Sequence, residues 1–108
     1  MSGQGTGGAV DFGYLEGFTA GDRQVISEVL TLFREQAERW TAALDETDPG
    51  WRDLVHTIKG SARGIGANAL GEVCARAEAE GPSGIAAVRA ALAAALAEIA
   101  AYQAARGA

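Results

Sequence analysis

The chain has one histidine and one lysine, three residues apart, and a glycine directly follows the lysine. On a helix, His56, Lys59 and Gly60 would share one face, because residues three and four apart are neighbours there. A neutral imidazole is a nucleophile, and a compact ammonium suits the charge that a phosphoryl group spreads over its oxygens. A position without a side chain leaves room for another surface. This combination predicts a patch that takes up a phosphoryl group and presents it to a docking partner.

A helical wheel places this patch away from the predicted core. With 100° between successive residues, His56 lies about 140° from Trp51 and Gly60 about 180° from it, whereas Lys59 lies at about 80°, at the margin of the apolar stripe. The apolar residues within about 60° of Trp51 are Leu54, Val55, Ile58, Ala62 and Ile65. We therefore expect an exposed imidazole rather than a hydrogen-bonded core histidine. An ordinary solvated surface histidine is the alternative.

The neighbours of His56 have more than one interpretation. Glycine inside a helix costs about 1 kcal/mol relative to alanine, so we interpret Gly60 as steric access rather than as close helix packing. Lys59 could be one more solubilising charge, although the other eight basic residues of the chain are arginines. Arg52 and Arg63, at about 100° and 120° on the wheel, would add positive field around the site. They could equally be solvated or pair with acids of the partner.

Composition narrows the fold class and the partners. A chain of 108 residues is long enough for one domain with a single core, and with 48% hydrophobic residues, two prolines and no alternating β-branched run it favours an all-α fold. A net charge of −5 argues against a nucleic-acid partner, which needs clustered basic charge. Cys74 is the only cysteine, which fits a reducing cytoplasm, and we interpret it as a small buried hydrophobe rather than a reactive thiol.

The apolar periodicity and the turn residues divide the chain into a Gly-rich tail, residues 1–9, and one helical domain, residues 10–106. Five helices are expected, over residues 10–18, over 22–46, from 48 to the glycines at 64 and 66, from 68 to 81, and from 82 onward. Asp48 and Pro49 are predicted to be the N-cap and first residue of the third helix. Asn68 is predicted to cap the fourth.

Short connections make consecutive helices antiparallel neighbours. The predicted architecture is an up-down-up-down four-helix bundle with a short additional N-terminal helix. No segment approaches the roughly 20 continuous apolar residues of a membrane span, and the N-terminus lacks the pattern of a signal peptide. We therefore expect a soluble cytoplasmic monomer with no membrane partner.

The segment His56 to Leu70, HTIKGSARGIGANAL, resembles the signature of bacterial histidine-containing phosphotransfer (HPt) domains. That signature has His, two residues, Lys-Gly, two small residues, and then a Gly-Ala turn leading to Leu. Cys74 and Glu78 also fall where such domains often have a cysteine and an acid, and LTLFREQAERWTAAL resembles the family's preceding helix. The resemblance covers about residues 12–104. Ile58 in place of the commoner Leu, and the added charge of Arg63, are the small departures.

The resemblance implies a four-helix bundle in which His56 is the phosphoacceptor, Lys59 steadies the phosphoryl group, and Gly60 is the gap that admits a receiver domain. The partners it implies are response-regulator receiver domains and a hybrid or sensor histidine kinase. It also implies a phosphocarrier rather than an enzyme, with no ATP-binding or kinase domain. No cofactor of its own is expected, because the receiver would bring the Mg²⁺.

Three other functions are alternatives to the phosphorelay function. A helical interaction module that binds a kinase or a receiver without accepting phosphate is the main alternative. The phosphoacceptor module of a sensor kinase is disfavoured, because that class usually has an acid directly after the histidine and this chain has Thr57. A metal site is disfavoured because one histidine, without neighbouring His, Cys or paired acids, cannot supply a ligand set.

Overall fold

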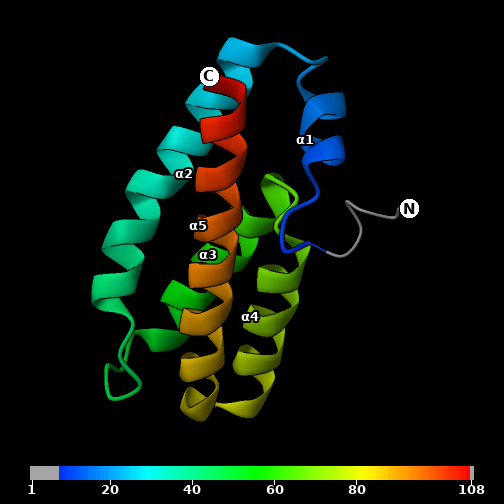
Figure 1. The fold of residues 1–108 in the computed structure, drawn as a ribbon. Coiled ribbons are helices and arrows are strands. Elements are labelled where there is room, and N and C mark those ends of the chain that lie inside the picture. Colours follow the sequence, from blue (N-terminus) through cyan, green and yellow to red (C-terminus); the bar gives the residue numbers. More distant parts are fainter. Residues whose placement is uncertain (1–7, 108) are drawn as a thin grey trace.

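The computed structural model describes residues 8–107, and in this range the regular structure is helical throughout (Figure 1). The helices are α1 (Phe12–Phe18), α2 (Arg23–Ala43), α3 (Trp51–Gly64), α4 (Asn68–Glu80), the short 3₁₀ turn η2 (Pro82–Gly84) and α5 (Ile85–Gly107). The four long helices alternate in direction, which confirms the predicted up-down-up-down bundle with a short leading helix. The expected Gly-rich tail, residues 1–9, lies mostly outside the described residues.

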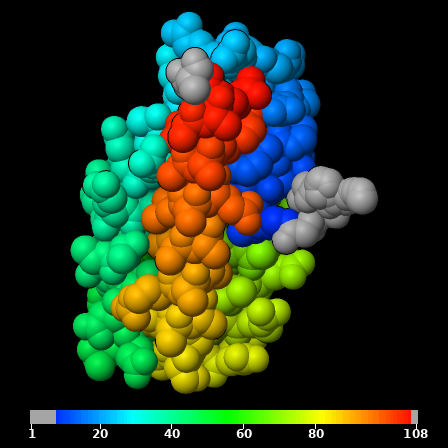
Figure 2. All heavy atoms as spheres, in the orientation of Figure 1, coloured from blue at the N-terminus to red at the C-terminus, as the bar shows by residue number. Residues whose placement is uncertain are grey.

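Each long helix turns one apolar stripe toward a single core. The fully or almost fully buried residues include Leu30 and Phe33 of α2, Val55 and Ile58 of α3, and Leu70 of α4. In the face drawn in Figure 2, α5 forms a central ridge between α2 on one side and α1 and α4 on the other. Ordinary periodicity of apolar residues therefore accounts for the bundle.

Helix α5 is apolar beyond its buried stripe. It is the one helix among the described residues that is long and apolar enough, by length and composition alone, to cross a membrane. That test is weak evidence, because core helices of globular domains also pass it. Here four large apolar side chains of the helix are buried in the core, and Leu96 and Tyr102 pack against it partly buried: the four are Ile85, Val88, Leu92 and Ile99. The exposed positions are mostly alanine.

The ends of α2 and α3 differ from the prediction. Helix α2 ends at Ala43 rather than near Glu46, because the Asp45 carboxylate accepts hydrogen bonds from the backbone N–H and the hydroxyl of Thr47 and so builds a turn. The prediction that Asp48 and Pro49 begin the next helix is wrong. Asp48 instead accepts from the N–H of Gly50, 2.9 Å away, and α3 begins at Trp51.

The boundaries of α4 and α5 were also placed slightly wrongly. Asn68 is the first residue of α4 rather than its cap, and Ala67 occupies the cap position without a side-chain hydrogen bond. Pro82 and Ser83 belong to the 3₁₀ turn, so the last helix starts at Ile85. At α5 a local 3₁₀ turn thus takes up two residues that the sequence pattern assigned to the helix, whereas α4 gains the residue that was expected to cap it.

The turn between α4 and α5 requires two glycines. Gly81 has a φ of +119°, a backbone conformation that residues other than glycine rarely adopt. Gly84 has no space beside it, since a Cβ there would lie 2.8 Å from the Cβ of Ala77 and 2.9 Å from its Cα. The close approach of η2 to α4 therefore depends on the missing side chain.

Helix α1 closes one end of the bundle. Asp11 caps it by accepting a hydrogen bond from the N–H of Tyr14, and the N–H of Asp11 donates to the carbonyl of Gly66, 2.8 Å away. The ring of Phe12 stacks on that of Tyr102 in α5, with centroids 4.0 Å apart. The leading helix is thus tied to the turn after α3 and to the last helix.

Candidate functional site

Helix α3 presents His56 to solvent, as the wheel predicted. The side chain of His56 is 69% exposed, whereas Val55 and Ile58 beside it are 0% exposed. The imidazole is therefore anchored on a buried helix while its ring stays accessible to another molecule. Its predicted exposure is confirmed.

An acid from α4 lies between the two residues that the sequence placed together. Nδ1 of His56 lies 2.9 Å from Oε2 of Glu78, and Nζ of Lys59 lies 2.5 Å from Oε1 of the same carboxylate. The side chains of Lys59 and Glu78 are each only 20% exposed. One carboxylate thus holds both the imidazole and the ammonium.

The charge state of Glu78 follows from these contacts. The hydrogen bond from Lys59 lowers the pKa of Glu78; burial opposes this, and the hydrogen bond with His56 lowers it further. The net direction is downward, so the carboxylate is ionised at neutral pH. An ionised carboxylate only accepts hydrogen bonds.

The tautomer of His56 follows from the ionised state of Glu78. Because Glu78 can only accept, Nδ1 of His56 must carry the proton in this contact. In the neutral ring Nε2 then has the free lone pair. The arrangement therefore offers a nucleophile at Nε2, on a ring whose orientation is fixed from the other side.

The two arginines predicted to add positive field around the imidazole both contact α4. The guanidinium of Arg52 donates to the backbone carbonyl of Glu78 and lies 4.6 Å above the ring of Trp51. The stem of Arg63 covers Gly71, where a Cβ would come within 3.0 Å of the Arg63 Cγ. Both residues fasten α3 to α4 on the outside of the bundle.

Gly60 lies one helical turn beyond His56 on the exposed face. A Cβ built at this position meets nothing within 4 Å, so no neighbouring element requires a glycine here. Close helix packing is thereby excluded as its explanation. The open space beside the imidazole fits the predicted steric access.

Cys74 lies one turn before Glu78 on α4 and is fully buried, which confirms the interpretation as a small core residue. Burial, followed by the charge of Glu78, raises the pKa of the Cys74 thiol to about 11. The thiol therefore stays protonated at neutral pH and is a poor nucleophile. Across residues 8–107, no three His, Cys, Asp or Glu side chains are grouped so that they could hold a metal ion.

Comparison with known proteins agrees with this geometry. The model of the Hpt domain matches residues 24–104, which span almost all of α2 to α5. The chain belongs to the Hpt domain family. It is also similar to the crystal structure of the histidine phosphotransferase ShpA from Caulobacter crescentus, with 61% sequence identity and a TM-score of 0.83. That match covers 93% of this chain and 95% of the other. No curated protein matches the chain.

Membership of the Hpt family establishes the general function. Hpt proteins are phosphocarriers that act with histidine kinases and receiver domains, and the chain is a phosphorelay intermediate of two-component signalling. The phosphorelay function expected from the sequence is confirmed at this level.

Glu78 is the residue of this Hpt site that the sequence analysis did not assign a role. The signal in the sequence was the family resemblance, in which Glu78 falls at a position that often has an acid. The structure adds the register of the antiparallel helices α3 and α4, because Arg63 lies over Gly71. Stepping seven residues outward from each member of that pair leads to His56 on α3 and to Glu78 on α4. The register of the hairpin would have placed an acid opposite the histidine.

Proposed function

We propose that His56 is the phosphoacceptor of this Hpt domain and that it exchanges its phosphoryl group with the aspartate of a receiver domain. The observation that carries the proposal is the pairing of a ring that is 69% exposed with a carboxylate that binds its Nδ1. Such a ring is accessible and held in the tautomer that leaves Nε2 free.

In the proposed transfer, Nε2 attacks the phosphorus of an aspartyl phosphate. The N–P bond forms, the P–O bond of the acyl phosphate breaks, and the aspartate carboxylate leaves with the electron pair. Nδ1 keeps its proton, so the ring becomes positive as the bond forms. The Glu78 carboxylate, 2.9 Å from Nδ1, is placed to stabilise that charge. The reverse reaction uses the same contacts.

Lys59 is proposed to stabilise the phosphoryl oxygens. Its ammonium has three N–H donors, and the contact with Oε1 of Glu78 uses one of them. Lys59 follows His56 by three residues on the same helix, so its remaining donors lie near the ring. The Mg²⁺ that phosphoryl transfer requires is proposed to come from the acidic pocket of the receiver, with no cofactor bound by this chain itself.

Exposed apolar side chains near α3 support docking of a receiver. Phe18 and Tyr14 of α1 are 72% and 47% exposed, and their rings stack with centroids 6.3 Å apart. Tyr14 lies against Gly66, directly after α3, because a Cβ on that glycine would be 3.2 Å from its ring. The surface of α1 therefore adjoins the end of α3 that carries Gly60.

Helix α2 extends this apolar surface. Val25 and Leu32, 39% and 53% exposed, lie about 100–120° to one side of the buried stripe of α2. Arg34, on the other side, reaches α5 through a hydrogen bond to Gln103. Val25 and Leu32 therefore lie on the α3 side. We name the four residues Tyr14, Phe18, Val25 and Leu32 the apolar docking surface.

The finer points of the function belong to the same proposal. The phosphoryl group would come from a sensor or hybrid kinase through a receiver, since His56 is the nucleophile and nothing in the proposed chemistry uses ATP on this domain. We propose a cytoplasmic monomer that binds neither nucleic acid nor membrane, in agreement with the net charge of −5.

The test is phosphotransfer to the wild-type chain and to His56→Gln from a receiver phosphorylated on aspartate. We expect acid-labile, alkali-stable label on the wild type and none on the variant, with equal helicity by circular dichroism. Label that persists on His56→Gln would exclude His56 as the acceptor. Binding of cognate receivers with no label on the wild type would instead indicate the non-catalytic interaction module.

A further inference from the structure

A second candidate site lies between α2 and α5, on the side of α2 that faces away from α3. A cavity of about 270 Å³ opens there. It is lined from α2 by Arg23, Gln24, Ile26, Ser27 and Leu30, and from α5 by Tyr102, Gln103 and Arg106. Its volume lies just below the range of small-molecule pockets, roughly 300–1,000 Å³, so it suits a compact ligand.

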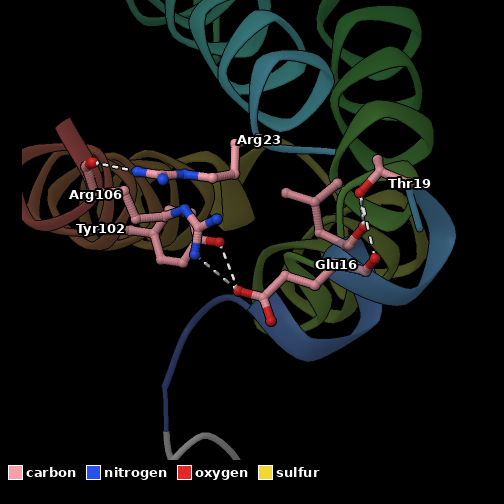
Figure 3. Close-up of polar contacts among 6 residues, drawn as sticks. Glu16, Thr19, Arg23, Tyr102 and Arg106 are labelled. Carbon is pink, nitrogen blue, oxygen red and sulfur yellow. Dashed lines mark hydrogen bonds and ion pairs between the residues drawn. The ribbon is translucent and has the colours of Figure 1, made fainter. Parts of the chain in front are cut away.

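The cavity is positively charged. Two arginines line it, and none of its lining side chains is acidic. Figure 3 shows Arg23 reaching across to α5, where its Nη2 donates to the backbone carbonyl of Arg106, 2.9 Å away. A carbonyl does not neutralise a guanidinium, and no acid among residues 8–107 forms an ion pair with Arg23. In a chain with a net charge of −5, such a cavity favours anions.

Arg106 is only partly neutralised. Its Nη1 lies 3.4 Å from Oε2 of Glu16, and that oxygen also accepts a closer hydrogen bond, 2.6 Å long, from the hydroxyl of Tyr102 (Figure 3). The Arg106 guanidinium lies 5.1 Å from the centroid of the Tyr102 ring. Each arginine has five N–H donors, and these contacts engage only one of them on each.

The rest of the lining is partly polar, because it includes Gln24, Ser27 and Gln103. Ile26 and Leu30 belong to the buried core stripe of α2 and underlie the cavity. Tyr102 is fixed on one face by the stacked ring of Phe12 and at its hydroxyl by Glu16. A ligand would therefore meet an aromatic ring that is already held in place, beside two guanidinium groups, which lowers the entropic cost of binding.

We propose that this cavity binds a compact organic anion, with an apolar body against the ring of Tyr102 and a carboxylate or phosphate head between Arg23 and Arg106. Planar guanidinium groups match both kinds of head with paired hydrogen bonds. The site is on the opposite side of α2 from the apolar docking surface and does not depend on the chemistry of His56.

The experiment is an amide NMR titration of the full ¹⁵N-labelled chain with 2-naphthoate, with 2-naphthyl phosphate, and with the neutral isostere 2-naphthamide. We expect saturable shifts from the first half of α2 and the last turns of α5 with at least one of the two anions; the tighter one identifies the preferred head. The amide should bind at least about tenfold more weakly, since it lacks the charge that the arginines would meet.

Variants make the assignment specific. Arg23→Gln and Arg106→Gln should each weaken binding of the preferred anion about tenfold. Arg39→Gln removes the same charge from an exposed position of α2 outside the cavity and should leave binding unchanged. Arg23→Gln breaks only one described contact, to a carbonyl, so its fold should be intact by circular dichroism.

Several outcomes would overturn the proposal. These are no saturable shift with either anion below about 1 mM, equal binding of the amide, or an equal loss in Arg39→Gln. Shifts centred on the apolar docking surface or on His56 would likewise place the anion elsewhere.

Discussion

The side chain of Glu78 orients His56 and pairs with Lys59. Its two carboxylate oxygens contact Nδ1 of His56 and Nζ of Lys59, and its backbone carbonyl accepts from Arg52. The imidazole on α3 therefore receives its orientation and tautomer from α4. Lys59, predicted from the sequence to stabilise the phosphoryl group or to be one more solubilising charge, is already paired with Glu78 before any phosphoryl group arrives.

Replacing Glu78 by Gln should slow phosphoryl transfer roughly ten- to a hundredfold, because a hydrogen bond to a charged group contributes about 1.5–3 kcal/mol. The measurement is the single-turnover rate from a phosphorylated receiver. Imidazole ¹⁵N shifts of His56 should show a smaller share of the tautomer protonated at Nδ1.

Glu80→Gln is the matched control, since it removes the same charge from an exposed position on α4. A rate in Glu78→Gln equal to that of the control would show that the carboxylate is not needed to position the ring.

Gly60 is the residue at which stability and transfer should change in opposite directions. Nothing lies within 4 Å of a Cβ there, so Gly60→Ala should raise the free energy of unfolding by about 1 kcal/mol. Transfer should fall as the side chain grows, a few-fold for Ala and about a hundredfold for Leu, because small displacements of reacting groups are costly. Urea denaturation and transfer kinetics give the two values.

Added bulk on a remote exposed helix provides the comparison for Gly60. Ala94→Leu on α5 should leave the transfer rate unchanged. If Gly60→Leu transfers as fast as the wild type, the gap beside His56 does not admit the partner.

At the scale of elements, α1 is a helix whose stability depends on contacts with other parts of the chain. Its seven residues are too few for a stable isolated helix. It is held by the backbone hydrogen bond from Asp11 to Gly66, by the stack of Phe12 on Tyr102, and by the Tyr102 hydroxyl on Glu16. Because α1 carries half of the apolar docking surface, these attachments matter for recognition.

The attachment through Tyr102 should be sensitive to alkali. Burial, and next the hydrogen bond with Glu16, raises the pKa of Tyr102 to about 12. Since the folded state favours the neutral phenol, its contribution to stability is complete below the ordinary tyrosine pKa near 10 and is lost as pH rises through about 12.

Tyr102→Phe should therefore unfold about 1 kcal/mol more easily than the wild type at neutral pH, and this difference should shrink between pH 10 and 12. Urea denaturation at several pH values measures it. A difference that stays constant up to pH 12 would mean that the hydroxyl does not tie α1 to α5.

The periodicity of apolar residues was sufficient to predict which segments form helices, but it was insufficient to predict where those helices begin and end. The stripe of α2, from Ile26 to Trp40, identifies a helix and its buried face without other information. The signal at Asp48 was misleading because its carboxylate stabilises the local turn at Gly50 instead of capping a helix. Competition between such turns and helix caps is decided by the neighbouring elements, which a single segment does not reveal.

In the candidate site, too, some features could be predicted from the sequence and others could not. Exposure of His56 followed from the wheel of one helix, because only α3 had to be known. The positions of Lys59 and Arg52 depend on Glu78, which comes from another helix. Contacts within a helix could be predicted from the sequence, and contacts between helices required the register of the α3–α4 hairpin.

At the scale of the whole molecule, α2 separates two surfaces of different chemistry. Val25 and Leu32, the half of the apolar docking surface that α2 carries, lie on its α3 side, and the positively charged cavity lies on its α5 side. A receiver approaching His56 would meet the first and leave the second open.

Phe18→Ser and Leu32→Ser should each weaken binding of a receiver about tenfold, since burying such a side chain contributes about 1.5–3 kcal/mol. Both side chains are more than half exposed, so the free energy of unfolding should change by no more than about 0.5 kcal/mol. Isothermal titration calorimetry with a receiver measures the affinity. Ala90→Ser on the exposed face of α5 should have no effect, and equal affinities for all three variants would place docking elsewhere.

The turn at Gly84 has a chemical consequence at a distance. Its missing side chain lets the start of α5 touch Ala77, and Ala77 directly precedes the acid that holds the imidazole. A methyl group at position 84 would push that stretch of α4 outward and carry Glu78 with it. We therefore expect the reactivity of His56 to depend on the space between Gly84 and Ala77, in a turn remote from the imidazole.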